Sequence, residues 1–403
     1  MVVLRRIGNS KGVHAMNGVQ ERSKAAGFLS AVLMLGATVM PSWAGGPCVT
    51  PEFLGHLDST PQDVVLVDNV AYLVGNQFGL QIIDVSNPTA PYLLGESNMS
   101  ITSFGLSVVG TVAYVADWNT GLLIFDVSDS TSPVLIGSYS TASNASGVVV
   151  VDGMAYLATY YSGLQIIDVS DPKFPVLLGS YNNSIVALDI EVVGATAYVV
   201  GGGDGAGLNI IDVSNPEFPF LLGSYATSSQ VNAVAVGNTT AYLANPVFGL
   251  QVIDVSDSIN PIWVGSYNTP GTTQGIFIVG TTAYLSDGES GLQILDVSDP
   301  ALPVWIGLYS PFGIDWSAQG VVVSGTTALV ADSRNGLLAL DVTNDCCVSI
   351  ADLTGDGSLD FFDVSGFLVL FQIMDPVADF TGDGEFNFFD VSAFLDAFND
   401  GCS

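Results

Sequence analysis

Basic residues are scarce in this chain of 403 residues, in which Lys and Arg number 7 against 39 Asp and Glu. Five of the seven lie before residue 45, so the remainder has 2 basic and 38 acidic side chains, a formal net charge of −36. Such a surface repels phosphate groups, which excludes nucleic acid and anionic lipid as partners. The low charged content and high apolar content, with 45 Gly, are typical of an all-β protein with many tight turns.

Histidine is nearly absent as well. After residue 44 it occurs once, at His56, so a histidine-rich metal site is excluded and a His-based nucleophile system would need that single residue. The glycine run at 201–205 is not a phosphate loop, because neither a Lys nor a helix pattern follows it. Carboxylate pairs for glycoside hydrolysis remain open among 38 acids, but none stands out. We therefore expect no catalytic residues and no enzyme.

Residues 1–44 read as a secretory signal peptide. Arg5, Arg6 and Lys11 begin a basic region, residues 25–40 form a short apolar run, and residues 42–44 make a small-x-small cleavage site. The run is short for a membrane span, so an uncleaved anchor is the alternative. Met16 is an alternative start. We expect a secreted protein, extracellular or on the cell surface, with no membrane insertion after the signal is removed.

A seven-residue phrase recurs along residues 45–345, beginning with Leu-Gln-Ile-Ile-Asp-Val-Ser at 80–86. Its Asp returns at steps of 42 to 45 residues, at Asp84, Asp126, Asp168, Asp212, Asp254, Asp296 and Asp341. Each unit holds four short apolar segments, as at 148–151, 155–158, 164–169 and 175–181. Four strands per unit predict the blades of a seven-bladed β-propeller. A β-solenoid is the alternative, but its coils are usually shorter.

The two ends of the array are complementary. The seventh unit stops after Thr343 without the Pro-x-x-Leu-Gly-Ser-Tyr segment that closes most other units, and residues 51–57 have that pattern in front of the first unit. We predict that this N-terminal strand completes the last blade beside the strand around Leu340. Closure of the ring also removes exposed sheet edges.

These units resemble the LVIVD repeats, in which the signature reads here as Leu-Gln-Ile-Ile-Asp, Leu-Leu-Ile-Phe-Asp or Leu-Asn-Ile-Ile-Asp. The resemblance covers roughly residues 51–343. It implies a β-propeller family of secreted and surface proteins, and it implies nothing specific about activity.

The turns of the units fall into two sets. Turns between first and second strands and between third and fourth strands repeat closely. We expect the repeated Asp, in the turn after the third strand, to accept hydrogen bonds within that turn, and a role as cation ligand is the alternative. The turns between second and third strands, and the connections between units, vary. Because strand direction alternates, these variable loops share one side of the ring, the variable face. Loops on a rigid scaffold often bind ligands. Aromatic side chains that would line this face, or alternatively pack between blades, are Phe78, Trp118, Tyr160, Tyr161 and Phe248.

Residues 346–403 change composition and contain two acidic loops 27 residues apart. Each has oxygen-bearing side chains at the spacing of a calcium loop, with a Gly at position 6 and a backbone carbonyl at position 7. A helical pattern follows each loop, at 364–371 and 391–398. We predict two Ca²⁺ ions, held by Asp352, Thr354, Asp356, Ser358, Asp360 and Asp363 in the first loop and by Asp379, Thr381, Asp383, Glu385, Asn387 and Asp390 in the second.

A duplicated loop and helix with Asp at position 12 resembles a dockerin domain, and the paired Phe-Phe-Asp-Val-Ser phrases with the final Gly-Cys resemble the GC-type dockerins. The resemblance implies docking to a cohesin-like scaffold or other cell-surface protein. Cellulosomal dockerins have small polar residues at loop positions 10 and 11. In their place this chain has aromatic pairs, which would form either a docking patch or a small core, at Phe361, Phe362, Phe388 and Phe389.

Four cysteines suit an exported chain. We predict the disulfides Cys48–Cys346, which would join the ends of blade seven, and Cys347–Cys402, which would bracket the calcium module. Four cysteines allow three pairings, and a bond from Cys402 to an anchoring partner is an alternative.

Together these features favour a non-catalytic binding propeller attached to a scaffold or surface through a calcium-dependent module. The alternative is a component of an extracellular polysaccharide-degrading complex that binds carbohydrate or hydrolyses glycosides. An extracellular glycan is therefore a further candidate partner.

Overall fold

The computed structural model describes residues 49, 51–76, 78–97, 99, 101–182, 186–203, 206–310, 316–343, 361–372, 374, 378–381 and 385–400. For residues 361–363 and 396–400 it describes the backbone alone. The calcium-loop residues Asp352 to Asp360, Asp383 and all four cysteines lie outside the described residues, so the predictions made for them stay predictions.

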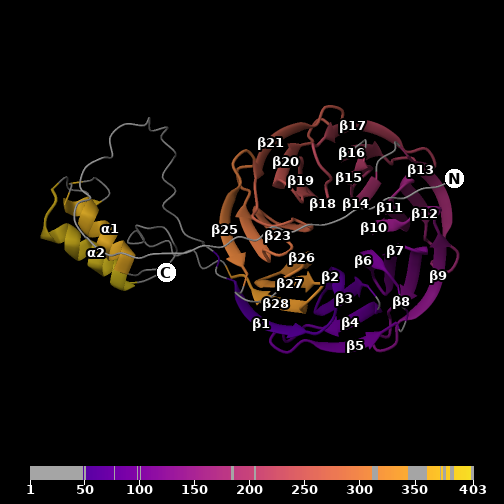
Figure 1. Ribbon diagram of the computed structural model, residues 1–403, viewed down its shortest axis with the longest axis horizontal. Helices are drawn as coiled ribbons and strands as arrows, with labels where there is room; N and C mark the ends of the chain where they lie inside the picture. Colours follow the sequence, from indigo (N-terminus) through magenta and orange to yellow (C-terminus); the bar gives the residue numbers. More distant parts are fainter. Residues whose placement is uncertain are drawn as a thin grey trace, which may run out of the picture. The chain divides into compact units, whose positions relative to one another are not determined.

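The described strands form seven antiparallel sheets of four strands each, arranged as blades around a ring (Figure 1). Blades 1 to 3 are β2 (Pro61–Val67), β3 (Val70–Gly75), β4 (Gly79–Asp84), β5 (Tyr92–Glu96); β6 (Ser103–Val109), β7 (Val112–Asp117), β8 (Gly121–Asp126), β9 (Val134–Ser140); and β10 (Ala145–Val151), β11 (Met154–Thr159), β12 (Gly163–Asp168), β13 (Val176–Tyr181). Blades 4 to 6 are β14 (Val186–Val193), β15 (Thr196–Gly202), β16 (Gly207–Asp212), β17 (Phe220–Ala226); β18 (Ala233–Gly237), β19 (Thr240–Asn245), β20 (Gly249–Asp254), β21 (Ile262–Tyr267); and β22 (Gly275–Val279), β23 (Thr282–Ser286), β24 (Leu292–Asp296), β25 (Val304–Tyr309). Blade 7 is β26 (Ala318–Ser324), β27 (Thr327–Asp332), β28 (Gly336–Asp341) and, from the other end of the chain, β1 (Glu52–Leu57). The seven-bladed propeller expected from the repeat is confirmed.

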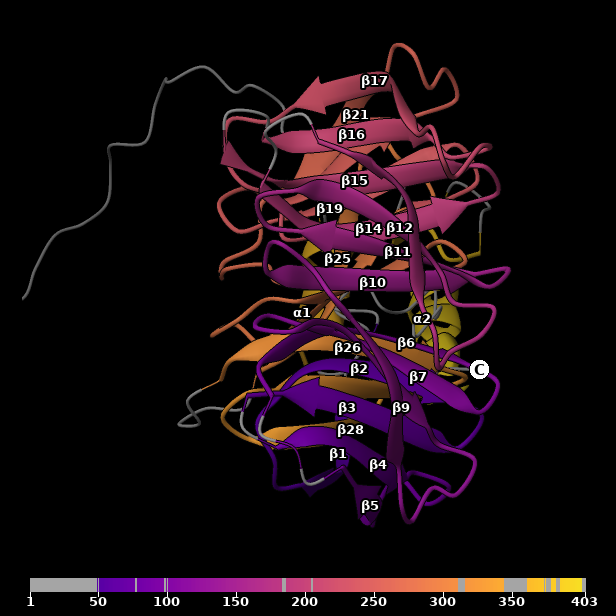
Figure 2. The same ribbon diagram turned by 90° about the vertical axis from the view of Figure 1, so that its right-hand side faces the viewer.

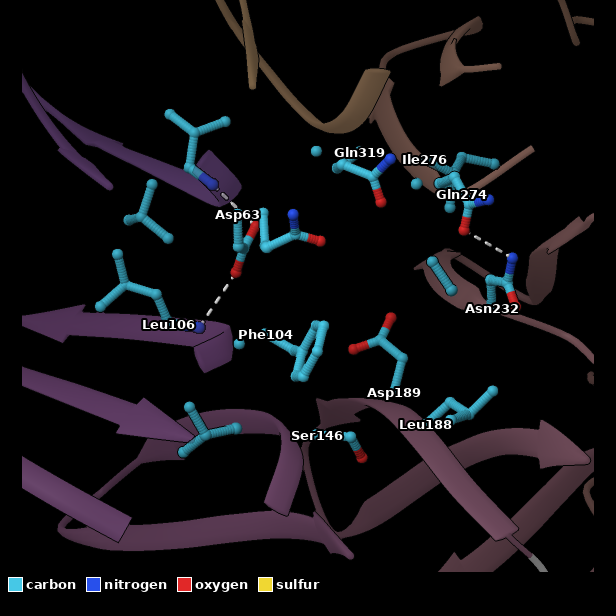
Figure 3. Close-up of a pocket in the computed structure, with 18 of the residues that line it drawn as sticks. Asp63, Phe104, Leu106, Ser146, Leu188, Asp189, Asn232, Gln274, Ile276 and Gln319 are labelled. Atoms are coloured by element: carbon cyan, nitrogen blue, oxygen red, sulfur yellow. Dashed lines mark hydrogen bonds between the residues drawn. The ribbon is translucent and has the colours of Figure 1, made fainter. Parts of the chain in front are cut away.

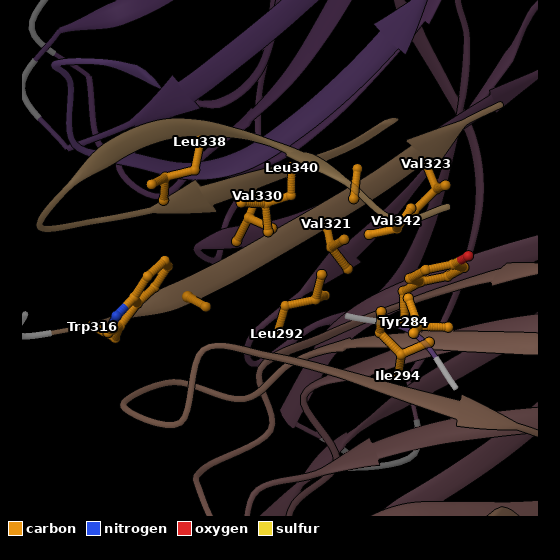
Figure 4. Packing of buried hydrophobic residues seen from close by; sticks show 13 residues of the cluster. Tyr284, Leu292, Ile294, Trp316, Val321, Val323, Val330, Leu338, Leu340 and Val342 are labelled. Atoms are coloured by element: carbon orange, nitrogen blue, oxygen red, sulfur yellow. The ribbon is translucent and has the colours of Figure 1, made fainter. Parts of the chain in front are cut away.

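The second and third strands of each blade form the core because they are covered on both faces. In β3 and β4 almost every side chain is buried, which explains why the repeated phrase is nearly continuous in apolar residues instead of alternating. Each seam between blades is a separate apolar cluster. At the seam of blades 6 and 7, Leu292 and Ile294 meet Val321, Val330 and Leu340 (Figure 4). Full burial of each such side chain stabilises the ring by roughly 1.5–3 kcal/mol.

The first strand of every blade lies innermost, where it contacts the first strands of its two neighbours. The strands run from one face of the ring to the other, so the loops that connect them gather on these two faces (Figure 2). The loops that follow second strands and the connections between blades therefore share one face, as the alternation of strand direction predicts. This is the variable face.

The ring closes through the N-terminal strand. β1 pairs with β28 in antiparallel register, with Phe53 opposite Leu340, so the predicted closure is confirmed. The described chain extends the closure one step further. The Val49 N–H donates to the carbonyl of Ile306 in blade 6 at 2.7 Å, and Val49 forms a parallel bridge with Gly307.

A repeated glycine lets adjacent blades approach closely. A Cβ built on Gly179 in β13 would lie 2.3 Å from the carbonyl oxygen of Pro216, in the turn between β16 and β17 of the next blade. Only glycine fits there without displacement of backbone. An added Cβ would meet a carbonyl oxygen of the next blade within 2.6 Å at Gly55, Gly95, Gly137, Gly223, Gly265 and Gly307 as well. For Gly307 that oxygen belongs to Val49, which takes the place that the turn between third and fourth strands occupies at the other seams.

The repeated aspartates hold those turns, as expected. Each accepts a hydrogen bond from the backbone N–H two residues later, at 2.8–2.9 Å in all seven units. These bonds lower the pKa of carboxyls such as Asp84 and Asp168, since the hydroxyl and the backbone N–H of the following Ser both favour the ionised form.

After the propeller, two helices are described, α1 (Phe361–Gln372) and α2 (Phe388–Asp400), at the two predicted helical patterns. They have their own small core, in which the rings of Phe367 and Phe394 stack at 4.2 Å and Phe380 packs edge-on against both. In the described part of the chain, neither helix is long and apolar enough to cross a membrane.

Candidate functional site

A cavity of about 660 Å³ lies at the centre of the ring, walled by the seven innermost strands (Figure 3). The strands β2, β6, β10, β14, β18, β22 and β26 enter it from the variable face, so their first residues form its mouth. The propeller thus brings together, in one concave site, residues separated by the whole length of the array.

The first ring of side chains inside the mouth is made by one equivalent position in each blade. The equivalence follows from strand register: each member lies opposite the fifth residue of its second strand, as Asp63 lies opposite Val74 and Asp189 opposite Val200. Five blades place Gly or Ala at this position, and two place Asp. The ring runs Asp63, Gly105, Gly147, Asp189, Ala233, Gly275 and Gly320.

The two aspartates fasten neighbouring blades together. The carboxylate of Asp63 accepts hydrogen bonds from the N–H of Val64 at 2.8 Å and, across the seam, from the N–H of Leu106 at 3.0 Å. Asp189 accepts the equivalent bond from Val234 at 3.0 Å. Burial in the ring raises the pKa of Asp63 to about 7 and that of Asp189 to about 6, although the backbone N–H groups act in the opposite direction.

One further acid lies in the next ring. Glu191 is on the same side of β14 as Asp189, and its ring is otherwise small or apolar apart from Ser107. Within the described residues its carboxyl has no hydrogen-bond partner. Burial, followed by repulsion from Asp189, raises the pKa of Glu191 to about 7. Among the described residues that line the cavity there is no Lys, Arg or His, so none of them compensates the charge of these acids.

Primary amides dominate one side of the mouth. Blades 5, 6, 7 and 1 present, in this order around the ring, Asn232, Gln274, Gln319 and Gln62, which we call the amide arc. Asn232 donates to the side-chain oxygen of Gln274 at 2.9 Å, and Gln319 donates to the hydroxyl of Ser317 at 3.0 Å. These bonds orient the amides while leaving donors and acceptors toward the cavity.

Aromatic rings dominate the other side. Phe104 and Trp118 line the cavity, and the contacts continue outward from Trp118 to Tyr160 at 5.1 Å and from Tyr160 to Tyr161 at 4.8 Å, all edge-on. We call these four the aromatic ridge. Of the five predicted aromatics, Trp118, Tyr160 and Tyr161 belong to it. Phe104 was missed, and alignment of the units would have placed it at the mouth, one residue before the ring position of Gly105.

The other two predicted aromatics lie elsewhere. Phe78 is half-buried and packs against the cluster shared by blades 7 and 1, in agreement with the alternative of packing between blades. Phe248 is exposed, and its loop is fixed by Asn245, whose side-chain oxygen accepts hydrogen bonds from the N–H groups of Val247 and Phe248. A binding role for either remains a prediction.

Buried polar side chains fix the loops that carry the ridge. Asp117 is almost fully buried and accepts hydrogen bonds from the N–H groups of Asn119 and Thr120, which shapes the turn around Trp118. From the next connection, the amide of Asn144 donates to the carbonyl of Trp118 at 2.6 Å. The ridge is therefore held before any ligand arrives, which reduces the entropic cost of binding.

The family model of the LVIVD repeat matches seven segments, at residues 60–98, 103–141, 142–183, 186–227, 230–269, 270–310 and 316–349, which is more than half of the chain. The chain belongs to the LVIVD-repeat family. Among curated proteins, none matches this LVIVD-repeat chain in sequence.

Solved structures show the same fold at low sequence identity. The β-propeller domain of Cps50 (Swd1) from Myceliophteria thermophila is 13% identical with a TM-score of 0.59, covering 73% of this chain and 100% of that one. The WD40 β-propeller domain of Doa1 is 12% identical with a TM-score of 0.56 (72% and 97% covered), and the computationally designed Ika8 protein is 9% identical with a TM-score of 0.54 (72% and 98% covered). At these identities the likeness concerns the fold of the LVIVD-repeat propeller alone.

The second acidic loop, beyond the last LVIVD repeat, is described in part. Asp390 is buried and accepts hydrogen bonds from the N–H of Thr381 at 3.0 Å, from its hydroxyl at 2.9 Å and from the N–H of Asn387 at 2.9 Å. The Thr381 hydroxyl also lies 3.4 Å from an oxygen of Asp379, so loop positions 1, 3 and 12 converge. These backbone and hydroxyl donors, that of Asn387 first, lower the pKa of Asp390 and keep it ionised.

Asn387 and Asp390 also cap α2. The side-chain oxygen of Asn387 accepts the N–H of Phe389, the second helical residue, at 2.8 Å, and Asp390 at the third position accepts the N–H of Asn387, as the acidic residue of a capping box does. Within the described residues, no three or more His, Cys, Asp or Glu side chains gather into a metal-holding group.

The aromatic pair after this loop points outward. Phe388 and Phe389 are 76% and 68% exposed and contact each other edge-on, so they do not join the small core around Phe367 and Phe394. Of Phe361, Phe362 and Asp363 only the backbone, at the start of α1, is described.

Proposed function

We propose that this protein is a non-catalytic binding propeller, secreted or displayed at the cell surface, that takes its ligand at the mouth of the central cavity on the variable face. The observation that carries the proposal is the concave site itself. It combines an amide arc, an aromatic ridge and a large cavity, and its loops are fixed by hydrogen bonds. A preformed pocket with a few convergent polar groups is the usual form of a binding site.

The experiment compares three versions of the full chain against immobilised glycans and cell-envelope fractions. The test variant is Trp118→Ala with Tyr161→Ala, which removes two rings of the ridge. The control is Phe174→Ala, whose ring is 74% exposed in the turn between β12 and β13 on the opposite face. We expect the control to bind as the wild type does and the test variant to lose binding. Equal binding by all three would contradict the proposal.

We further propose that residues 346–403 attach the propeller to a cohesin-like scaffold or another surface protein, and that calcium orders this module with one ion in each loop. The convergence of Asp379, Thr381 and Asp390 supports the second site, because these are the loop positions that supply oxygen ligands. The exposed pair of Phe388 and Phe389 supports a docking patch.

Glycoside hydrolysis is the second candidate, since the cavity holds Asp63, Asp189 and Glu191, all with raised pKa values. The first two accept backbone hydrogen bonds that fasten blades, so Glu191 is the acid left for chemistry. Release of reducing ends from a polysaccharide, lost in Glu191→Gln, would establish this candidate in place of the binding function.

A further inference from the structure

The strongest unexplained arrangement on the variable face is the division of the cavity mouth into two unlike halves. Four consecutive blades contribute amides, and the next two contribute the aromatic ridge. The fold does not require this division, because all seven blades share one backbone plan. The chemistry of the two halves therefore indicates which kind of ligand the site binds.

The amide half selects neutral hydrogen-bonding groups. Each primary amide offers both donors and acceptors, and the described residues of the cavity lining include no cation to pair with an anionic ligand. The side-chain amide of Gln62 has no hydrogen-bond partner within the described residues, so this amide is available to a ligand. The acids Asp63 and Asp189 lie just inside, and once ionised they repel carboxylate- or phosphate-bearing molecules.

The aromatic half selects an apolar face and extends beyond the cavity. Phe104 and Trp118 line the mouth, whereas Tyr160 and Tyr161 continue the ridge outside it, with Tyr161 68% exposed. A ligand that uses the whole ridge is therefore longer than the cavity. Its buried unit needs a polar edge toward the amides and an apolar face toward the rings, which is the amphipathic character of a pyranose sugar.

We infer that the site binds the end of a neutral oligosaccharide, with the terminal sugar in the cavity against the amide arc and the following sugars along the aromatic ridge. This inference rests on the proposed function and specifies its ligand. The residues that line the cavity end before the last residue of every innermost strand, so the cavity stops short of the opposite face of the ring. Recognition is therefore of a chain end.

The test is calorimetric titration of the full chain with neutral gluco-, xylo-, manno- and N-acetylglucosamine oligosaccharides of one to five units. We expect one series to bind with an affinity that rises with length. Gln62→Ala should weaken every length by about threefold to tenfold, the loss of one hydrogen bond. Tyr161→Ala should leave the monosaccharide unchanged and weaken the longer oligomers by about threefold to tenfold, the loss of one ring contact. Phe174→Ala is the control and should match the wild type.

Several outcomes separate this inference from the function on which it rests. If envelope fractions bind in a ridge-dependent way but no neutral oligosaccharide does, the inference is overturned and the binding function stands. Tighter binding of uronic acid or de-acetylated glucosamine oligomers would also overturn it, because neither is neutral. If nothing binds in a manner sensitive to Trp118 and Tyr161, the inference and the proposed function both fall.

Discussion

The seam glycine offers a measurement of how tightly the blades are packed. In Gly179→Ala, the new methyl carbon would lie 2.3 Å from the carbonyl oxygen of Pro216 and 2.9 Å from that of Glu217. Ordinary contacts begin at 3.4 Å, so the two blades must separate by about 1 Å or the methyl must tilt by as much. Both contacting groups are backbone, and no side chain can rotate out of the way.

The magnitude follows from two opposing effects. Forcing an extra carbon into a packed seam costs about 1–3 kcal/mol. Replacing Gly by Ala also restricts the unfolded chain, which stabilises by about 0.4–1 kcal/mol where the backbone permits it. We therefore expect Gly179→Ala to lower the free energy of unfolding by about 1–2 kcal/mol. At about 2–4 °C per kcal/mol, the midpoint of thermal unfolding should fall by several degrees.

A matched control exists at the end of β18. A Cβ on Gly237 would come no closer than 3.9 Å to any other group, the ring of Tyr242, and this glycine does not have a positive φ. Gly237→Ala should leave stability unchanged or raise it by about 0.4–1 kcal/mol. The measurement is urea and thermal unfolding followed by circular dichroism. If Gly179→Ala is as stable as Gly237→Ala, the contact with the next blade is not the reason for the glycine.

The cavity acids predict an unusual pH dependence. The pKa values of Asp63 and Asp189 are raised to about 7 and about 6, against 3.8 for an ordinary Asp. The folded protein therefore keeps protons that the unfolded chain loses. The contribution of these two groups to stability is fully present below pH 3.8 and is lost as pH rises through 6 and 7. The free energy of unfolding should fall less between pH 5 and pH 8 in the Asp63→Asn, Asp189→Asn double variant than in the wild type. An identical fall in both proteins would show that these groups titrate normally. Calcium titrated into the full chain should release heat and increase the helical signal in circular dichroism. Asp379→Asn should weaken calcium binding at the second site by about tenfold. Glu385→Gln should not weaken it, because this position ligates through its backbone carbonyl.

The features that the sequence predicted well are those in which each unit repeats the others. Blade number follows from the period, and the turn hydrogen bonds of residues such as Asp84 follow from local chemistry that any Asp-Val-Ser phrase would repeat. The pairing of Phe53 with Leu340 was accessible because a missing segment at one end and a surplus segment at the other have the same pattern. Each of these inferences needs only short-range information or a count.

The cavity was not accessible in the same way. Asp63 and Asp189 follow β-bulges at the start of their strands, between Pro61 and Asp63 and between Ala187 and Asp189, which shift the alternation of side chains at those points. A strict alternation of inward and outward side chains along the strand does not predict that these acids, and not their neighbours, face the centre of the ring.

The two outcomes for aromatics also have a local cause. In blade 1, Gly75 ends the second strand, and the Phe78 ring folds back over it; an added Cβ there would lie 2.9 Å from that ring. In blade 5 the residue equivalent to Gly75 is Asn245, whose side-chain oxygen accepts hydrogen bonds from the N–H groups of Val247 and Phe248, and the equivalent ring of Phe248 stays exposed. At this loop position, three residues after the strand, the ring packs inward where the strand ends in Gly and stays exposed where the strand ends in Asn.

A repeat protein separates the residues required by its fold from the others without any comparison with relatives. Where all seven units agree, as at the turn aspartates, the residue serves closure and packing that every blade needs. Where the units differ at one equivalent position, the fold has shown that it accepts several residues there. Five blades close around Gly or Ala at the inner ring, so Asp63 and Asp189 are additions to a ring that already closes. The same reasoning applies to the amides and rings at the mouth, and it points to the innermost strands, not the long outer loops, as the place where this propeller differs from a purely structural one.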